Sequence, residues 1–353
     1  MKAPPLGPEP LRLEPVFSPR IWGARSLAPL FPEKVDLAEP LGEAWLTGLD
    51  CKISASAFRG KTLREAWREM PSEWRGAKFA EGHAFPLLVK FIFPTEMLSL
   101  QVHPDDAYAS VHEQAAGGRG KTEMWHIVSA DWQAQILLGL KPGVDKKAFL
   151  TGLRSGTLES LFQPVPVHAG DTIFVPAGTQ HAIGPGMVVC EVQQYSDLTY
   201  RVHDFGRIDS QGKPRELHIE KALGVTRFGS NLAGKTAALP LPAEHAERSL
   251  LAACRYFATE RWEVTSPVTI AMDHEHFDLF VVLAGSGVLQ TPDFAFPSEP
   301  GECWFLPANL KEYCFKTTEP ATFIRTYVPH LPALREELGT VRQGMATNHT
   351  IFD

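Results

Sequence analysis

Short apolar segments separated by turns fill residues 85–195, and this pattern is the strongest restriction on how the chain folds. The segments are rich in Val, Ile, Leu and Phe, and Pro or Gly lies between them. Such spacing is typical of an all-β sandwich or barrel. The predicted strands are FPLLVKFI (85–92), MLSLQVH (97–103), EMWHIVSA (123–130), QAQILLGL (133–140), DTIFVPA (171–177) and MVVCEVQQY (187–195).

Helical patterns are fewer. Thr62 and Glu65 have the Thr-x-x-Glu spacing of a capping box, which predicts a helix that continues through Trp67. Residues 145–162, 216–225 and 331–338 are the other predicted helices. The fold class that follows is mainly β with a few accessory helices.

The length of 353 residues is about twice that of a usual domain. A segment rich in Gly, Ala and Pro spans residues 228–247 and reads as a linker. The sequence therefore predicts an N-terminal domain over 1–227, this linker, and a C-terminal domain over 248–353.

An internal echo indicates that the two domains are related. GDTIFVPAGTQH (170–181) aligns without gaps on GECWFLPANLKE (301–312). In the second copy Asn309 replaces Gly178 and Glu312 replaces His181. If the first copy holds a site, we expect the second to have lost it.

The charge pattern excludes several classes of partner. A net charge of -7 and a pI near 6.0 provide no basic surface for nucleic acid or acidic lipid. No apolar stretch approaches the roughly 18 to 20 residues of a membrane span. The five cysteines are odd in number and form no CxxC pair, which fits reduced thiols. We expect a cytoplasmic protein without nucleic-acid or membrane partners.

Candidate metal ligands lie at the ends of predicted strands. Gln101 and His103 are two residues apart, so they face the same side of their strand, and Ser99 joins them. Glu123 opens the next strand and His181 follows the PAG turn. Two imidazoles, a carboxylate and an amide oxygen suit Zn²⁺ or another first-row divalent ion with an open coordination position. The spacing alone does not bring them together, since a lone Gln-x-His is more often structural.

Neighbouring polar residues have other predicted roles. Asp105 and Asp106 follow Pro104 at the first turn of a predicted helix, where carboxylates stabilise the positive end. They are therefore expected to turn the chain rather than to bind metal. His126 has the opposite parity to Glu123 and is expected to point away from the site.

The motif GDTIFVPAGTQHAIG resembles the second cupin motif. The series LGEAW, FPLLVKF, LSLQVHPDD, GKTEMWHI, PAGTQHAIG, EVQQYSDLTYRVHDFGR and GKPRELH is similar, in order and spacing, to short bacterial type I mannose-6-phosphate isomerases. These motifs cover about residues 20–225. The remainder resembles the C-terminal cupin domain of that family more loosely.

This resemblance implies two cupin (jelly-roll) domains and a metal-dependent isomerase with one Zn²⁺ per chain. The implied reaction interconverts mannose 6-phosphate and fructose 6-phosphate through a cis-enediol. Arg201 matches the catalytic arginine of the family, and Lys121 matches a basic position near the phosphate or the reacting carbons. The implied metal ligands are Gln101, His103, Glu123 and His181. Two departures, IFPTE (92–96) and Leu46 after the Gly-Glu-x-Trp motif, concern the pocket wall.

Other roles stay open at this level. The guanidinium of Arg201 stays protonated at neutral pH, so it suits stabilisation of an enediolate better than proton abstraction. The base is Glu191 or Lys121, and Asp197 is a candidate for assisting ring opening. Substrate contacts are assigned to Lys121 and to a set of four residues: Ser99, Arg119, Trp22 and Trp45. For the tryptophans a purely structural role in the core is the commoner case, and for Arg119 a solvated glycine loop is an equal alternative.

Two further functions compete. A cupin dioxygenase or decarboxylase with Fe or Mn usually has a compact His-x-His-x3-4-Glu motif, whereas Glu123 lies 20 residues beyond His103. A non-catalytic sugar-phosphate-binding regulator would keep some of the same residues. AAGGRGKT resembles a phosphate-binding P-loop, but a P-loop is followed by a helix and this segment is followed by a predicted strand, so a nucleotide-binding role is not expected. His274 and His276 lack a PxGxxH partner and are expected to be structural. The sequence leaves monomer and homodimer open.

Overall fold

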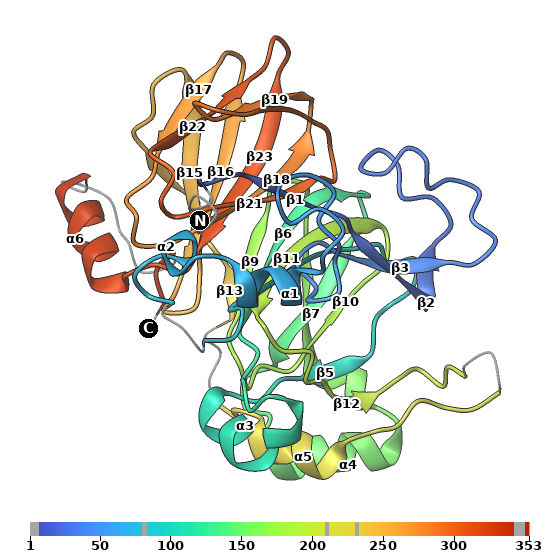
Figure 1. Ribbon diagram of the computed structural model, residues 1–353. Coiled ribbons are helices and arrows are strands. Elements are labelled where there is room, and N and C mark those ends of the chain that lie inside the picture. Colours follow the sequence, from blue (N-terminus) through green and yellow to red (C-terminus); the bar gives the residue numbers. More distant parts are fainter. Residues whose placement is uncertain (1–6, 80–82, 209–211, 230–232, 342–349, 353) are drawn as a thin grey trace.

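The computed structural model describes residues 7–79, 83–208, 212–229, 233–341 and 350–352. The chain forms two β-sandwiches stacked one on the other, with α3, α4 and α5 at the outer end of the N-terminal one and α1 and α2 near the junction (Figure 1). This architecture confirms the mainly β cupin prediction. No helix in the described ranges is long and apolar enough to cross a lipid bilayer.

The N-terminal sandwich places a seven-stranded sheet against a five-stranded one. The larger sheet has the order β13-β9-β6-β11-β4-β3-β2, and the smaller has the order β12-β5-β10-β7-β8. Most predicted strands are confirmed, with ends shifted by a few residues. The bounds are β2 Val16–Ala24, β3 Leu41–Trp45, β4 Leu87–Ile92, β5 Leu100–Val102, β6 Glu123–Ala130, β7 Gln135–Leu140, β8 Phe162–Pro166, β9 Thr172–Val175, β10 His181–Ile183, β11 Met187–Gln194, β12 Tyr200–His203 and β13 Gly234–Lys235.

The C-terminal sandwich repeats this arrangement with a seven-stranded and a four-stranded sheet. The orders are β1-β21-β18-β23-β16-β15-β14 and β17-β22-β19-β20. The bounds are β1 Leu11–Leu13, β14 Leu239–Leu241, β15 Ala246–Ala253, β16 Ala258–Val264, β17 Val268–Ala271, β18 Asp278–Ala284, β19 Gly287–Gln290, β20 Ala295–Ser298, β21 Cys303–Leu306, β22 Glu312–Lys316 and β23 Ala321–Tyr327.

The two large sheets are equivalent strand by strand. In β6 and β9 Glu123 pairs with Val175, and in β18 and β21 Asp278 pairs with Leu306. Val175 and Leu306 are also aligned in the sequence echo, so both comparisons give the same register. One outermost strand of each large sheet comes from outside its predicted domain, because β1, from the N-terminal domain, pairs with β21, and β13, from the predicted linker, pairs with β9. The division of the chain at 228–247 stays a prediction.

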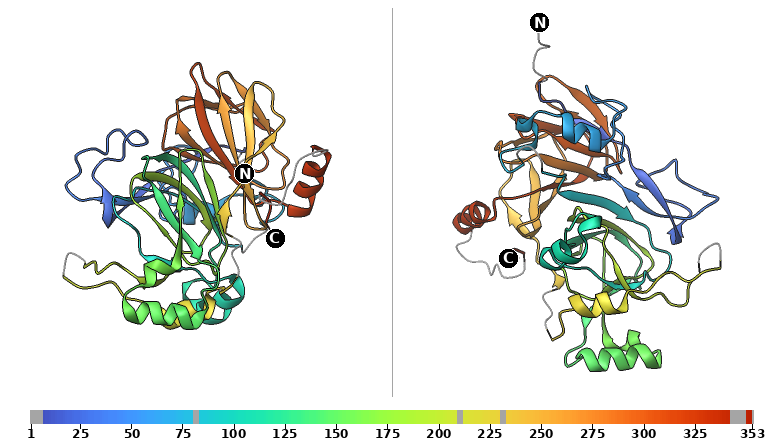
Figure 2. Two further views of the ribbon diagram at one scale, coloured as in Figure 1. Left: turned by 180° about the vertical axis from the view of Figure 1, so that it is seen from behind. Right: turned by 60° about the horizontal axis from the view of Figure 1, so that its bottom comes forward.

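The helices are short, and most begin within a few residues of the predicted start, although the sequence analysis did not predict α2. Thr62 caps α1, and the reciprocal bonds of the capping box with Glu65 are present. The predicted helix over 145–162 is interrupted at Gly156, which adopts a positive φ of 70° and ends α4. Helices α3, α4 and α5 lie below the N-terminal sandwich, whereas α6 projects beside the C-terminal one (Figure 2). The bounds are α1 Leu63–Glu69, α2 Ser72–Arg75, α3 Asp106–His112, α4 Lys146–Ser155, α5 Ile219–Val225 and α6 Leu331–Val341, with short 3-10 turns at Gln114–Ala116 and Leu158–Leu161.

A shared aromatic core joins the two sandwiches. Phe85 stacks on Phe277 at a ring-centroid separation of 5.6 Å, and Trp67 makes edge contacts with Phe277 and Phe305. These rings belong to one buried cluster with residues from both halves. Rings of this size bury large apolar areas, so their packing fixes the two sandwiches against each other.

Candidate metal centre

Three neighbouring strand ends of the N-terminal sandwich carry the predicted ligands. Gln101 lies in β5, directly opposite His181, the first residue of β10. His103 follows β5 immediately, and Glu123 opens β6 in the facing sheet. The fold therefore brings together residues that are up to 80 positions apart in the sequence.

The ligand atoms of three of these residues converge in the interior. One ligand atom each from His103, Glu123 and His181 lies within 4.8 Å of the others. Nε2 of His181 is 3.3 Å from Oε1 of Glu123, and Nε2 of His103 is 3.5 Å from Oε2. All three side chains are at most 1% exposed. Within the described residues no other group of three His, Cys, Asp or Glu side chains converges in this way.

The outer nitrogens of both imidazoles fix their orientation. Nδ1 of His103 lies 2.7 Å from the Leu198 carbonyl oxygen, and Nδ1 of His181 lies 2.9 Å from that of Thr179. Since a carbonyl oxygen only accepts, each Nδ1 donates a proton and each Nε2 presents a lone pair. Burial and the charge of Lys121 lower the pKa of His103 to about 4, and burial lowers that of His181. Both rings are therefore neutral near pH 7, as metal ligation requires.

This donor set fits a divalent cation. Oε1 of Glu123 is buried and accepts no hydrogen bond from the described residues. The nearest imidazole atom to this oxygen is the unprotonated Nε2 of His181. Two acceptors, Oε1 of Glu123 and Nε2 of His181, therefore face each other without a proton between them. Such an arrangement is costly unless a cation lies between the acceptors. Two imidazole nitrogens and a carboxylate are ligands typical of catalytic zinc.

Gln101, the fourth predicted ligand, is half-buried and lies against His181. Its amide nitrogen is placed 3.3 Å from Nε2 of His181, and its oxygen accepts from the Ser99 hydroxyl at 3.2 Å. The two ends of an amide differ by a half-turn of the side chain, so either end reaches His181. A metal ion would select the oxygen, because an amide nitrogen has no lone pair to offer.

Lys121 is the cation nearest to these ligands. Its Nζ is 3.1 Å from Nε2 of His103 and forms an ion pair with Glu123. Burial raises the pKa of the Glu123 carboxyl, but the positive charge of Lys121 outweighs this effect and the pKa lies well below its usual range. The carboxylate is therefore charged and suited to hold a cation.

Behind the ligands lies a chain of buried charges that the sequence analysis did not assemble. Glu191 in β11 pairs with Lys90 in β4 at 2.9 Å, and Lys90 approaches Glu43 in β3 at 3.5 Å. Glu191 also accepts from Trp125 Nε1 at 3.0 Å and lies 3.8 Å from Lys121. Burial raises the pKa of Glu191. A lysine inside the apolar strand LLVKFI was the one sequence signal for this chain, because lysine is seldom fully buried without a partner.

Arg201 lies beside the ligands through strand pairing. In β12 it stands opposite Gln101 of β5, and opposite residues of an antiparallel pair share a face. One Nη donates to the Glu216 carbonyl at 3.0 Å, whereas the buried Nε has no acceptor among the described residues. Burial and then the charge of Arg215 lower the pKa of Arg201. Part of its guanidinium is thus available to a ligand.

The remaining predicted site residues lie further from the ligands or have other partners. Trp22 is 3% exposed within the core of the N-terminal sandwich. Trp45 donates to Glu43 at 3.1 Å, with the Lys90 ammonium over its ring at 5.6 Å. Arg119 donates to the main-chain carbonyls of Phe85 and Ala84 at 2.7 and 3.3 Å, and Asp197 is exposed. The assigned roles of these residues stay predictions.

The acidic pair after Pro104 shapes the chain, as the sequence predicts. Asp105 is the N-cap of α3 and accepts from the Tyr108 amide at 2.9 Å. Asp106 accepts from the Gly120 amide at 2.8 Å and from the Tyr256 hydroxyl at 2.7 Å, which ties the loop to the C-terminal sandwich. Neither carboxylate belongs to the converging ligand group. His126 contacts Thr172 at 3.1 Å instead of the ligands.

Comparisons with known proteins agree with this geometry. Residues 11–124 match the family "Phosphomannose isomerase type I, catalytic domain", and residues 246–328 match "Mannose-6-phosphate isomerase, cupin domain". A mannose-6-phosphate isomerase of Streptococcus mutans is 34% identical over 311 residues, which cover 87% of this chain and 95% of that protein.

Solved structures give the same result. The mannose 6-phosphate isomerase of Bacillus subtilis superimposes with a TM-score of 0.82 at 33% identity, over 90% of this chain and 99% of that one. A zinc-bound mannose 6-phosphate isomerase shares the fold with a TM-score of 0.69 at 16% identity, over 90% of this chain and 99% of its own. The identity to full-length relatives and the converging ligand set lead to one conclusion: this chain belongs to the type I mannose-6-phosphate isomerase family.

Proposed function

We propose that this protein interconverts mannose 6-phosphate and fructose 6-phosphate in a metal-dependent reaction. The observation that carries the proposal is the buried Oε1 of Glu123, which faces the lone pair of the oriented His181 imidazole and accepts no hydrogen bond from the described residues. Such a group needs a cation, and the family relationship supplies the reaction.

The metal would be Zn²⁺, one ion per chain, held by Gln101, His103, Glu123 and His181; other first-row divalent ions suit the same donors. When bound, such an ion supplies Lewis-acid stabilisation of the negative charge that grows on the carbonyl oxygen during an aldose–ketose conversion. The Leu198 and Thr179 carbonyls would hold the two imidazoles in the required tautomer.

Arg201 would stabilise the enediolate of the sugar. Its Nε lacks an acceptor, and its backbone position faces Gln101 across the strand pair. A guanidinium stays protonated at neutral pH, so it provides a fixed positive charge rather than a base. Proton transfer between the two sugar carbons therefore needs another group.

Two buried groups are candidates for this base. Lys121 and Glu191 lie 3.8 Å apart, and Lys121 also contacts His103. Burial raises the pKa of Glu191, which moves it toward the range useful for a base at neutral pH. Oε1 of Glu191 accepts from Trp125 and Oε2 only ion-pairs with Lys90, whereas Lys121 contacts both His103 and Glu123 of the proposed ligand set. Lys121 is for this reason the better candidate, and the exposed Asp197 is assigned to ring opening of the cyclic sugar.

The substrate would lie over Ser99 and Gln101, with Lys121 near its phosphate or its reacting carbons. Trp45 is partly exposed and is the better candidate for a pocket wall than the buried Trp22. Arg119 is the remaining candidate for phosphate contact. The proposal includes action in the cytoplasm on a small sugar phosphate, as a monomer or homodimer.

A coupled assay of the purified protein tests the proposal. Fructose 6-phosphate formed from mannose 6-phosphate is measured before chelation, after chelation, and after Zn²⁺ is restored. Chelator-sensitive turnover that zinc restores is expected. Turnover that persists without metal, or oxygen consumption in place of isomerisation, would favour another cupin activity. Metal and sugar-phosphate binding without turnover would indicate a regulator.

A further inference from the structure

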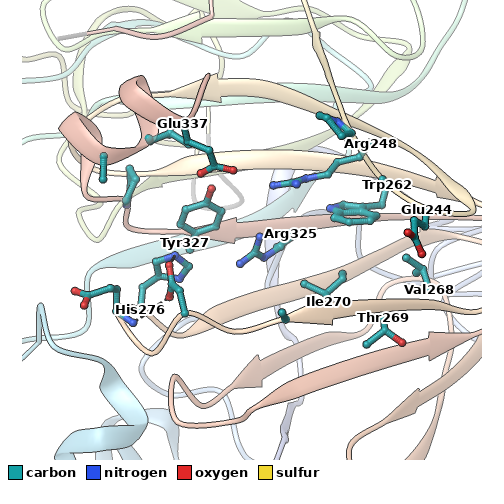
Figure 3. Close-up of a pocket in the computed structure, with 18 of the residues that line it drawn as sticks. Glu244, Arg248, Trp262, Val268, Thr269, Ile270, His276, Arg325, Tyr327 and Glu337 are labelled. Carbon is teal, nitrogen blue, oxygen red and sulfur yellow. Dashed lines mark hydrogen bonds and ion pairs between the residues drawn. The ribbon is translucent and has the colours of Figure 1, made fainter. Parts of the chain in front are cut away.

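A second pocket lies in the C-terminal sandwich, outside the site described above. Its volume is about 620 Å³, within the range of small-molecule sites. The wall residues come from β15, β16, β17, β23 and α6 (Figure 3). In the centre Arg325 lies between Tyr327 and Ile270, and Arg248 lies with Trp262 at one side.

The pocket is the counterpart of the metal centre in the repeated fold. Asp278 opens β18 as Glu123 opens β6, and both pair at the same position of the neighbouring strand. His276 precedes Asp278 by two residues, as Lys121 precedes Glu123. Phe280 is opposite Arg325, just as Trp125 is opposite Glu191. Arg325 therefore occupies the position of Glu191.

The same register extends across the sheet. Arg325 pairs with Glu260 as Glu191 pairs with Lys90. In the next strand of each sheet, Arg248 and Glu43 are at equivalent positions. Arg248 lies opposite the residue two beyond Glu260, and Glu43 lies opposite the residue two beyond Lys90. The buried charges thus have the opposite sign at three positions. Glu43, Lys90 and Glu191 correspond to Arg248, Glu260 and Arg325.

The metal ligands themselves are absent from this copy. In the N-terminal sandwich Gln101 pairs with His181. In the C-terminal sandwich the buried pair on the small sheet, between β17 and β22, is Ile270 and Tyr313. The sequence echo aligned Glu312 with His181, but Glu312 is exposed in the structure. Its neighbour Tyr313 is buried instead and donates to Asp278 at 3.0 Å. A cation is still present next to the acid, because Arg325 Nε donates to Asp278 at 2.7 Å.

The buried carboxylates beside the pocket, Glu260 and Asp278, accept hydrogen bonds from several protein donors. Glu260 accepts two bonds from Arg248, one from Trp262 and one from Tyr327. Asp278 accepts from Tyr313 and Arg325 and lies 3.3 Å from His276. Both oxygens of Glu260 and Oδ2 of Asp278 thus have protein donors, whereas Oδ1 of Asp278 makes no hydrogen bond with the described residues.

Unused donors remain on Arg325. Its Nε is engaged, but its two terminal nitrogens make no hydrogen bond with the described residues, and the closer contact to Glu260 is 3.5 Å. The residue is only 7% exposed and lines the pocket. Terminal guanidinium nitrogens without a protein acceptor can bind an acceptor with two oxygens, as in a carboxylate or phosphate.

In the interior next to Arg325, cations outnumber carboxylates. Arg248, Arg325 and His276 supply three buried or half-buried cations against the two carboxylates of Glu260 and Asp278. Burial lowers the pKa of His276, but its bonds to Asp273 and Asp278 outweigh this and raise it to about 9. At the rim four exposed carboxylates also line the pocket, those of Asp273, Glu244, Glu275 and Glu337, and Asp273 pairs with His276. Water screens these rim charges, which disfavour a polyanion more than a single anionic group.

We infer that the C-terminal pocket binds a small metabolite that presents one carboxylate or phosphate group to Arg325. In this proposal the pocket binds its ligand without a metal ion, and its residues occupy the same strand positions as those of the proposed metal centre. It requires no catalysis and does not rest on the proposed isomerase activity.

Calorimetric titration of the zinc-loaded full-length protein tests this inference. The probes are malonate, inorganic phosphate and fructose 6-phosphate, which separate a carboxylate from a phosphate and a simple anion from a sugar phosphate. Arg325→Lys keeps the charge beside Asp278 and Glu260 but removes the fork. Arg261→Lys, on β16 with its partner Glu263 outside the pocket, is the matched control.

The expected result is a binding event in the wild type and in Arg261→Lys that weakens about tenfold or more in Arg325→Lys. Isomerase kcat should be unchanged in all three proteins. If Arg325→Lys does not fold, Ala333→Trp fills the pocket from α6 without altering the charges, and it should abolish the same event. Absence of binding for all three probes, or equal affinity in the wild type and the folded variant, would overturn the inference.

Discussion

Nε2 of His181 lies 3.3 Å from Oε1 of Glu123, although neither atom carries a proton to donate to the other. Two acceptors this close favour a cation between them, and the pair lies at the centre of the proposed metal site. His181→Ala should therefore lower zinc affinity by more than about 100-fold and abolish isomerisation. Metal analysis after dialysis measures the first effect. His274→Ala, a histidine far from the ligands in sequence and exposed, is the control and should keep one zinc per chain.

Asp105 is expected to matter for stability alone. As the N-cap of α3 it accepts the Tyr108 amide, so Asp105→Ala should cost about 1 kcal/mol of unfolding free energy in urea. Zinc content should not change. Loss of zinc from a folded Asp105→Ala protein would show that the carboxylate belongs to the metal site after all.

Arg201→Ala should lower kcat by about 100- to 1,000-fold, because it removes one fixed donor to the developing negative charge. Metal occupancy should stay at the wild-type level. Steady-state kinetics together with zinc analysis of the same sample measures both. Wild-type turnover at full occupancy would contradict the role given to Arg201.

Lys90→Met should destabilise the protein by about 3 to 5 kcal/mol, because it leaves Glu191 and Glu43 buried without their shared cation. The double variant Lys90→Met/Glu191→Gln removes one of the two unpaired buried charges. It should recover part of the lost unfolding free energy. Urea unfolding of both variants measures the difference. Equal stability of the single variant and the wild type would mean that the chain of charges contributes little.

His276 makes stability depend on pH. Its pKa is about 9 in the folded protein against 6.5 for the free side chain. The protonated form is favoured by the fold, so its contribution is complete below pH 6.5 and is lost as the pH rises through 9. The loss should be on the order of 3 kcal/mol. Unfolding free energies between pH 6 and 10 should fall more steeply for the wild type than for His276→Gln; parallel curves would refute this assignment.

Much of the fold could be predicted because its signals are local. The alternation of Gln101 and His103, the turn before His181 and the capping box at Thr62 depend on neighbouring residues only. The ends of β5 were wrong, since the predicted strand over 97–103 is reduced to Leu100–Val102. Even so, His103 stays close enough to Gln101 to reach the same site.

The charge chains could not be predicted because they depend on strand register. Lys90 and Glu191 are 101 positions apart and meet only because β4 and β11 pair in one register. The echo at 301–312 revealed the repeat, but an ungapped alignment chose Glu312 where the sheet places Tyr313 inward. The reversal of charge from Glu191 to Arg325 therefore became visible only in the paired sheets.

The central claim is that one metal ion at Gln101, His103, Glu123 and His181 supports isomerisation. Titration of the metal-free protein with Zn²⁺, with fructose 6-phosphate formation and bound zinc measured in each sample, tests it most directly. Activity should rise in proportion to bound zinc and level off at one ion per chain. Full activity in the metal-free protein, or activity unrelated to zinc bound in this site, would contradict the account.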